Sequence, residues 1–141
     1  MSNSIFARRP IKIFALIGAL ITGMFLISAC SSSPSAITTV DPQAFLQAAS
    51  QPGTTVIDVR TPAEYAAGHL QGAVNIDVEA PTFLAGIEAL NKSGSYAVYC
   101  HSGRRSALAS DQMSTAGFTN ITNIQGGIAD LQAAGGSTVT S

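Results

Sequence analysis

Apolar and polar residues follow two different periods along the chain, and the two kinds of segment alternate. Four short runs rich in apolar and β-branched residues are expected to be strands: TTVIDV (54–59), GAVNI (72–76), SYAVYC (95–100) and TNITNI (119–124). Segments with helical spacing lie before, between and after them. This alternation predicts an α/β fold, in which a mostly parallel sheet is covered by helices on both faces.

The helical segments are marked by their caps and by one apolar face. Five are expected, at 42–50, 62–67, 81–90, 105–117 and 126–136. The second has the sequence of a capping box, with Thr61 as the N-cap, Pro62 at the first position and Glu64 at the third. The inward faces of the third and fourth are expected to carry Phe83, Leu84, Ile87 and Leu90, and Ala109, Met113 and Ala116, respectively.

The first 29 residues have the pattern of an export signal rather than of a folded element. Three basic residues (Arg8, Arg9 and Lys12) precede an uncharged apolar run at 13–27, and small residues then lead to Cys30. The run is shorter than the about 20 residues of a spanning helix. The segment LISAC resembles a bacterial lipobox, which implies cleavage before Cys30 and a lipid on its sulfur. The alternative is an uncleaved anchor helix followed by an unrelated cysteine.

Cleavage would leave one folded domain with a short spacer before it and a short tail after it. The expected parts are a lipoprotein signal peptide (1–29), the lipidated Cys30 with a flexible spacer (30–36), one domain (37–136) and a frayed tail (137–141). The lipid would hold the exported domain at a bacterial membrane, outside the cytoplasm. Without the leader, four basic residues face eight acidic ones, a net charge of −4 that disfavours nucleic acid as a partner.

The cysteine count draws attention to Cys100. If Cys30 carries a lipid, Cys100 is the remaining thiol and has no partner for an internal disulfide. A leftover cysteine in an exported protein indicates intermolecular pairing or a reactive thiol. The alternative is a buried cysteine that serves only as a small apolar residue.

The segment CHSGRRS around this thiol favours the reactive interpretation. It joins an expected strand to an expected helix, so successive backbone N–H groups can point inward and bind an anion. Gly103 can adopt a positive φ and let the loop curl, and Arg104 and Arg105 add positive charge. Such surroundings lower a cysteine pKa from about 8.5 to about 3.5–7.5. The alternative is a solvated arginine pair beside a structural cysteine.

Three motifs together resemble those of rhodanese-like domains: VIDVRTPAEYAAGHLQGAVNI, YCHSGRRSALA and GFTNITNIQGGIADLQAAG. The resemblance implies a five-stranded sheet and sulfurtransferase chemistry, in which Cys100 takes the outer sulfur of thiosulfate as a persulfide and passes it to cyanide or a thiol. No metal or organic cofactor is implied. The active-site loop would consist of His101, Ser102, Gly103, Arg104 and Arg105 beside Cys100. Arg104 is the expected anion contact, and Arg105 is expected to turn inward and brace the loop.

Other residues of the motifs are given supporting roles. Asp58 and Arg60 lie near the expected site, where Arg60 is expected to pair with Glu64 or to form a surface ion pair, and Ser106 follows the loop. His69 is interpreted as a hydrogen-bonded structural histidine rather than a base. The family usually has a tryptophan near position 131, where this chain has Leu131.

Three other functions fit parts of the pattern. A persulfide carrier that delivers sulfur to a protein partner would need the same cysteine. An arsenate or phosphate-ester enzyme is disfavoured because only four residues separate Cys100 from Arg105. An inert scaffold is disfavoured because the thiol and both arginines are present.

Overall fold

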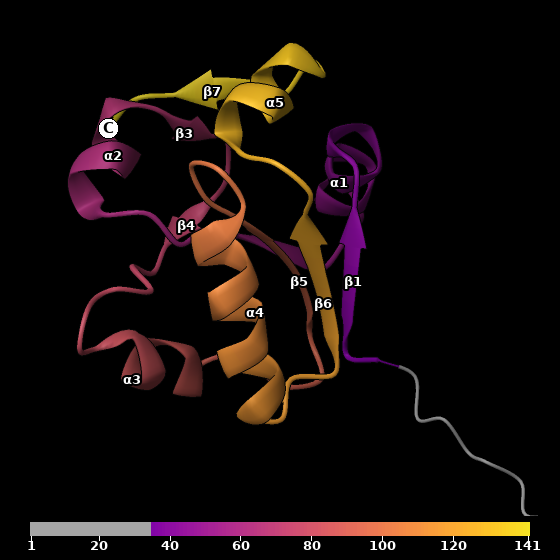
Figure 1. Ribbon diagram of the computed structural model, residues 1–141, viewed down its shortest axis with the longest axis vertical. Coiled ribbons are helices and arrows are strands. Elements are labelled where there is room, and N and C mark those ends of the chain that lie inside the picture. The colour runs from indigo at the N-terminus through magenta and orange to yellow at the C-terminus, as the bar shows by residue number, and fades with distance from the viewer. Residues whose placement is uncertain (1–34) are drawn as a thin grey trace, which may run out of the picture. The chain divides into compact units, whose positions relative to one another are not determined.

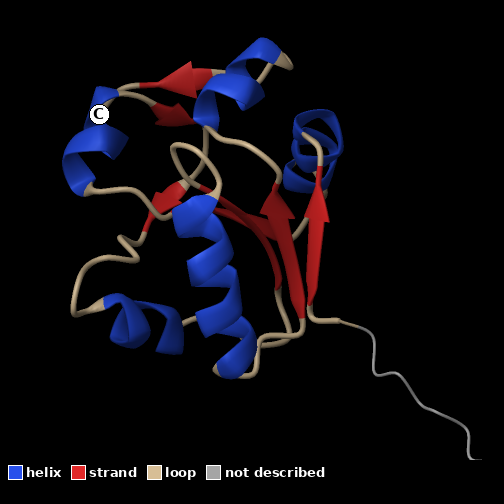
Figure 2. Ribbon diagram, in the orientation of Figure 1, coloured by secondary structure: helices blue, strands red, loops and turns tan. Residues whose placement is uncertain are grey.

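The computed structural model describes residues 35–141. The expected signal peptide and Cys30 lie outside the described residues, so both stay predictions. The centre of the fold is a five-stranded sheet with the strand order β1-β6-β5-β2-β4. Every neighbouring pair in this sheet is parallel. Figure 1 and Figure 2 show the sheet with helices around it, which confirms the predicted α/β architecture.

The sheet has five strands, and the four that apolar runs predicted are each shorter than the corresponding run. The five are β1 (Ile37–Val40), β2 (Thr54–Asp58), β4 (Val74–Asn75), β5 (Ser95–Tyr99) and β6 (Asn120–Ile124). The central strand β5 pairs with β2 over its whole length, from Ser95 opposite Thr54 to Tyr99 opposite Asp58. The edge strand β1 was missed from the sequence, because its two inner residues are exposed threonines and its four residues form no apolar run.

The helices are α1 (Pro42–Ala49), α2 (Pro62–Ala67), α3 (Phe83–Glu88), α4 (Arg104–Thr115) and α5 (Ile128–Ala133). The capping box of α2 is confirmed: the Glu64 N–H donates to the Thr61 hydroxyl at 3.3 Å, and the Thr61 N–H donates to the Glu64 carboxylate at 3.1 Å. Asp41 caps α1 by accepting a hydrogen bond from the Ala44 N–H at 2.9 Å. Local side-chain chemistry therefore determines where these two helices begin.

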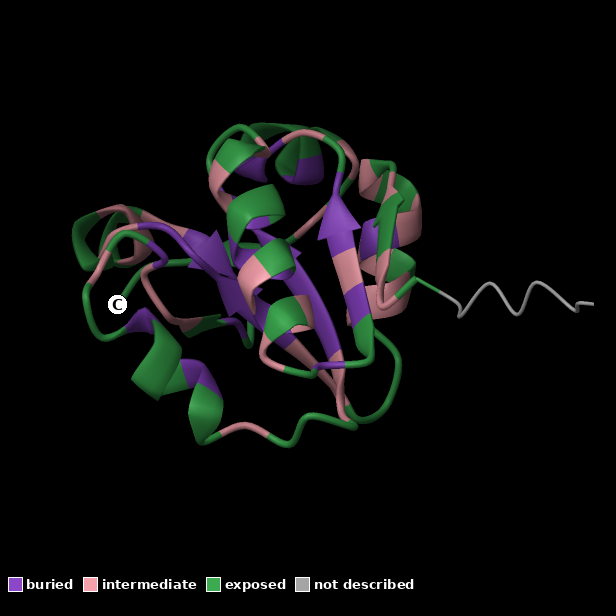
Figure 3. Ribbon diagram, turned by 60° about the horizontal axis from the view of Figure 1, so that its bottom comes forward, coloured by how far each residue is buried: buried purple, intermediate pink, exposed green. Residues whose placement is uncertain are grey.

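Two hydrophobic cores cover the two faces of the sheet. Alternate residues of each strand serve alternate cores, as Ile57 and Val98 do on one face and Val56 and Ala97 on the other. Helices α3 and α4 cover the first face, and α1 and α5 cover the second. Figure 3 shows the buried sheet between partly exposed helices. Both cores lie entirely within residues 37–131, so a chain that begins at Ser35 retains them.

Leu131 stands in the second core, where the family usually has an aromatic residue. Its side chain is fully buried and packs in the same cluster as Phe45, Leu70 and Ile128. The aliphatic side chain therefore closes this core without a tryptophan.

Two expectations about the periphery are wrong. Leu84 is 55% exposed, because the short helix α3 directs only Phe83 and Ile87 into the core. The tail, which was expected to fray, contributes β7 (Thr138–Val139), and this strand pairs antiparallel with β3 (His69–Leu70). A two-residue pairing between distant segments leaves no local pattern in the sequence.

No helix within residues 35–141 has both the length and the apolar character needed to cross a membrane.

The two faces of α3 should respond differently to truncation. Ile87→Ala opens a cavity in the first core and is expected to lower the free energy of unfolding by about 2–5 kcal/mol. Leu84→Ala removes an exposed side chain and should change it by less than about 0.5 kcal/mol. Urea denaturation of the chain from Ser35 measures both, and equal losses would contradict the assignment of the buried face.

Candidate active site

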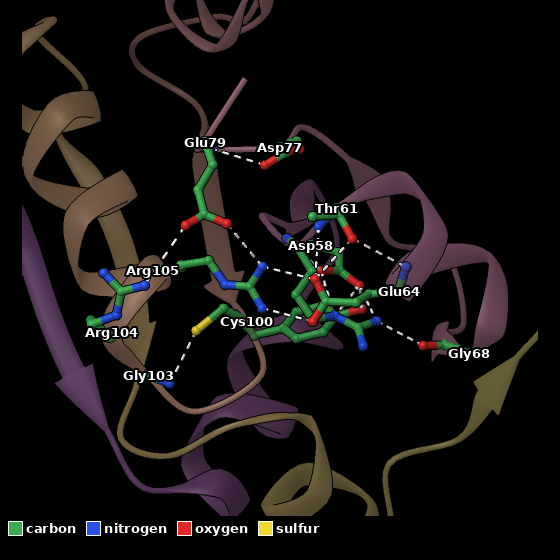
Figure 4. A network of polar contacts seen from close by, with 12 residues as sticks. Asp58, Thr61, Glu64, Gly68, Asp77, Glu79, Cys100, Gly103, Arg104 and Arg105 are labelled. Atoms are coloured by element: carbon green, nitrogen blue, oxygen red, sulfur yellow. Dashed lines mark hydrogen bonds and ion pairs between the residues drawn. The ribbon is translucent and has the colours of Figure 1, made fainter. Parts of the chain in front are cut away.

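The thiol of Cys100 lies at the carboxyl edge of the sheet. Cys100 directly follows β5, and residues 101–103 curl back before α4 begins at Arg104. Its side chain has no exposed surface, and its Sγ accepts a hydrogen bond of 3.0 Å from the Gly103 N–H (Figure 4). Gly103 adopts a φ of +93°, as the sequence predicts for a curled loop. This edge is where parallel α/β sheets bind their ligands.

Backbone hydrogen bonds determine the ionisation of this thiol. Burial by itself raises the pKa of Cys100, but hydrogen bonds from the Ser106 and Ser102 N–H groups, the Ser106 hydroxyl and the Gly103 N–H outweigh it and lower the pKa below its ordinary value. Ser106 is fully buried, and its hydroxyl lies 3.0 Å from the Gly103 carbonyl oxygen, so its one proton can be donated either to that oxygen or to the Cys100 thiolate. The loop therefore favours a thiolate, which is the nucleophilic form.

Gly126 and Gly127, which follow β6, pack against the loop of residues 101–103. The Ile128 N–H donates to the Cys100 carbonyl oxygen at 3.0 Å, which ties α5 to the loop. Any Cβ on Gly127 would lie 1.7 Å from the His101 carbonyl oxygen, so only glycine fits there. The sequence analysis missed Gly126 and Gly127 as parts of the site. The double glycine between a strand and a helix was the available signal.

Arg105 is engaged by two carboxylates. It donates to the Glu64 oxygens at 2.7 and 2.8 Å and to Glu79 at 3.3 Å, and its side chain is 14% exposed. The hydrogen bond from Arg105 is the main reason that the pKa of Glu64 falls to about 2. Arg105 therefore has the inward, bracing position that the sequence predicts. The sequence allowed a pair between Glu64 and Arg60, but Glu64 pairs with Arg105 instead.

Arg104 takes a different position from its neighbour. Its side chain is 77% exposed, and it lies 3.7 Å from Glu79. His101 and Ser102 are also exposed at the rim of the loop. Arg104 is thus an exposed cation near the site, held within residues 35–141 only by this long ion pair.

Asp58 and Arg60 form a buried ion pair rather than the surface pair that the sequence allowed. The Arg60 Nε donates to both Asp58 oxygens, at 2.9 and 3.0 Å, and Arg60 Nη2 donates to the Gly68 carbonyl oxygen at 2.7 Å. The Tyr99 hydroxyl donates to Asp58 Oδ2 at 2.7 Å. Since Tyr99 directly precedes Cys100, this network fixes the backbone that carries the thiol.

His69 has structural contacts. Its Nδ1 lies 2.9 Å from the Tyr65 carbonyl oxygen, and its ring stacks on the Tyr65 ring at 3.6 Å between centroids. These contacts agree with a structural rather than a catalytic histidine. Within residues 35–141, no group of three or more His, Cys, Asp and Glu side chains is placed to hold a metal ion.

Two serines of the loop provide a matched test of the thiolate environment. Ser106→Ala removes a hydroxyl that lowers the pKa of Cys100, so the midpoint of its alkylation by iodoacetamide should move to higher pH. Ser102→Ala is the control, since Ser102 acts through its backbone N–H, which alanine retains. An unchanged midpoint in Ser106→Ala, or an equal shift in both variants, would contradict the role of the hydroxyl.

Proteins similar to this chain include one named as an enzyme and one named as a putative sulfur carrier. The chain is 36% identical over 75 residues to the thiosulfate sulfurtransferase PspE of Escherichia coli (strain K12), covering 53% of this chain and 71% of PspE. It is 33% identical over 101 residues to the putative sulfur carrier protein YrkF of Bacillus subtilis (strain 168), covering 71% of this chain and 54% of YrkF. The chain spans about half the length, 48%, of two plant relatives that it matches at 38% identity.

The structural comparison agrees with the sequence comparison. A solved structure described as a rhodanese with anions from E. coli superimposes with a TM-score of 0.53 and 32% identity, covering 62% of this chain and 99% of that one. Residues 41–134, more than half of the chain, match the family of the rhodanese-like domain. The chain therefore belongs to the rhodanese-like domain family.

Proposed function

We propose that this domain is a sulfurtransferase that accepts sulfur from thiosulfate, or from a similar anionic donor, on Cys100. The observation that carries the proposal is the thiol of Cys100 itself, which lies at the carboxyl edge of the sheet and has its pKa lowered by a ring of hydrogen bonds. The likeness to the thiosulfate sulfurtransferase PspE and to a rhodanese solved with anions supports it.

The first half-reaction loads the enzyme. The Cys100 thiolate attacks the outer sulfur of thiosulfate, a new S–S bond forms, and the old S–S bond breaks with its electron pair leaving on sulfite. Three negative charges enter this step and three leave it, so no proton transfer is needed. The N–H groups of Ser102, Gly103 and Ser106 that stabilise the thiolate would also face the negatively charged persulfide.

The second half-reaction unloads the enzyme. Cyanide or a thiolate attacks the outer sulfur of the persulfide, and the Cys100 thiolate leaves. Because the thiolate is both nucleophile and leaving group, its lowered pKa assists this step as well. The chemistry is complete without a cofactor.

The alternative function is that of a persulfide carrier that hands sulfur to a partner protein. The likeness to the putative sulfur carrier protein YrkF favours this second candidate. A carrier would load its cysteine but would discharge slowly to small acceptors.

Intact mass and thiocyanate production test the proposal together. Incubation of the chain from Ser35 with thiosulfate should add the mass of one sulfur atom, and cyanide should remove it with formation of thiocyanate. Cys100→Ser is the control, and its thiocyanate production should fall to the uncatalysed rate. A persulfide that forms but resists cyanide would favour the carrier, and no added sulfur would exclude both functions.

The lipoprotein-like pattern at residues 1–30 supports a separate proposal about where the protein is located. We propose that Cys30 bears the lipid that holds this domain at a bacterial membrane, on the support of the basic, apolar and small-residue segments that precede it. Expression of the full chain in bacteria with labelled palmitate should label the protein and place it in the membrane fraction. Cys30→Ser should lose the label, and a label that persists in this variant would contradict the proposal.

A further inference from the structure

Glu79 lies beside the active-site loop, although it belongs to none of the motifs around Cys100. It stands between β4 and α3, where its N–H donates to Asp77 Oδ1 at 2.9 Å and so fixes the turn. Its side chain is 49% exposed. One carboxylate oxygen lies 3.7 Å from Arg104 Nη2, and the other lies 3.3 Å from Arg105 Nη1. Figure 4 shows the Glu79 side chain pointing toward both arginines.

The arginines beside the thiol are therefore balanced by carboxylates. Glu64 engages both terminal nitrogens of Arg105, and Glu79 shares one of them. Among the described residues, Arg104 has a single ion-pair partner, which is Glu79. Two positive and two negative side chains thus meet next to Cys100. An incoming anion gains little net attraction here while Glu79 holds its place.

The two glutamates differ in how easily they can be displaced. Glu64 is held by two short hydrogen bonds from Arg105 and by the capping box of α2. Glu79 makes longer contacts, is half exposed, and pairs with Arg104, whose side chain is itself 77% exposed. An anion at the mouth of the site would compete with Glu79 rather than with Glu64, because exposed ion pairs are weak.

We infer that Glu79 is a specificity-determining residue that weakens the preference of the Cys100 site for doubly charged over singly charged sulfur donors. This inference rests on the proposed sulfurtransferase function. The repulsion between Glu79 and a donor is proportional to the charge of the donor, so a dianion is repelled twice as strongly as a monoanion at the same position. Glu79 would therefore reduce the advantage that thiosulfate has over organic thiosulfonates and related monoanions.

Thiosulfate and methanethiosulfonate form a matched pair of donors for this purpose. Both offer a terminal sulfur to the Cys100 thiolate, and in both the S–S bond breaks with its electron pair on the leaving group. The leaving group is sulfite in the first case and methanesulfinate in the second, and the enzyme persulfide is the same. The two donors differ by one unit of charge.

The experiment compares Glu79→Gln with the wild-type chain from Ser35, at low ionic strength because salt screens exposed charges. The ratio of kcat/KM for thiosulfate to kcat/KM for methanethiosulfonate should rise about fivefold in Glu79→Gln, the effect of one unit charge about 4 Å away when both charges are as well hydrated as in bulk water. Glu88→Gln is the control. It removes the same charge from the exposed end of α3, and Glu88 makes no salt bridge within residues 35–141. Its ratio should stay at the wild-type value.

Alkylation of Cys100 gives a second readout that does not depend on sulfur transfer. The ratio of the rate with iodoacetate, an anion, to the rate with neutral iodoacetamide should rise in Glu79→Gln and stay constant in Glu88→Gln. Changes in the nucleophilicity of the thiol cancel in both ratios.

The outcomes separate this inference from the proposed function. An unchanged donor ratio in Glu79→Gln, or an equal rise in both variants, overturns the role of Glu79. If no variant turns over either donor, the proposed sulfurtransferase function fails, and the alkylation ratio alone decides: an increase confined to Glu79→Gln supports charge selection by Glu79, and an unchanged ratio overturns it.

Discussion

The buried carboxylate of Asp58 holds together the segments that meet at the carboxyl edge of the sheet. It ends β2 and accepts hydrogen bonds from Arg60 and from the Tyr99 hydroxyl at the end of β5. The same hydroxyl accepts the Leu70 N–H at 3.0 Å, which brings β3 into the network. A buried charge without partners would cost several kcal/mol, so the loss of any one of these groups would destabilise the whole network. Because Tyr99 directly precedes Cys100, the network also fixes the position of the Cys100 backbone.

The loop at this edge stabilises an anion mainly through its backbone. The residues that lower the pKa of Cys100 are Ser102, Gly103 and Ser106, and most of their hydrogen bonds come from N–H groups. The positive charge of Arg104 and Arg105 is balanced by Glu64 and Glu79. Fixed backbone dipoles would need no reorganisation in the proposed change from thiolate to persulfide, whereas exposed side chains would. The arginines therefore contribute ion pairs that join the loop to neighbouring segments, and the hydrogen bonds that lower the pKa of the thiol come from other residues.

Much of the fold was accessible from local patterns. Capping chemistry places the start of α2 at Pro62, and the apolar run before Cys100 places the thiol at the end of a strand. Expectations failed where a single contact with a distant segment decides the outcome. Glu64 lies four residues from Arg60, yet it binds Arg105 from another part of the chain. The tail has no apolar run, yet its strand β7 pairs antiparallel with β3.

The sequence by itself determined the α/β class, the alternation of the four central strands with helices, the place of Cys100 at the end of a strand and the curled glycine loop that follows it. These features depend on residues that are neighbours in the chain, whose propensities and caps act over a few positions. Only the tertiary structure decided which carboxylate faces which arginine, that Gly127 lies against the His101 carbonyl, and that Glu79 stands at the mouth of the site. Those contacts join segments far apart in sequence, and the packing of the sheet and helices sets their distances.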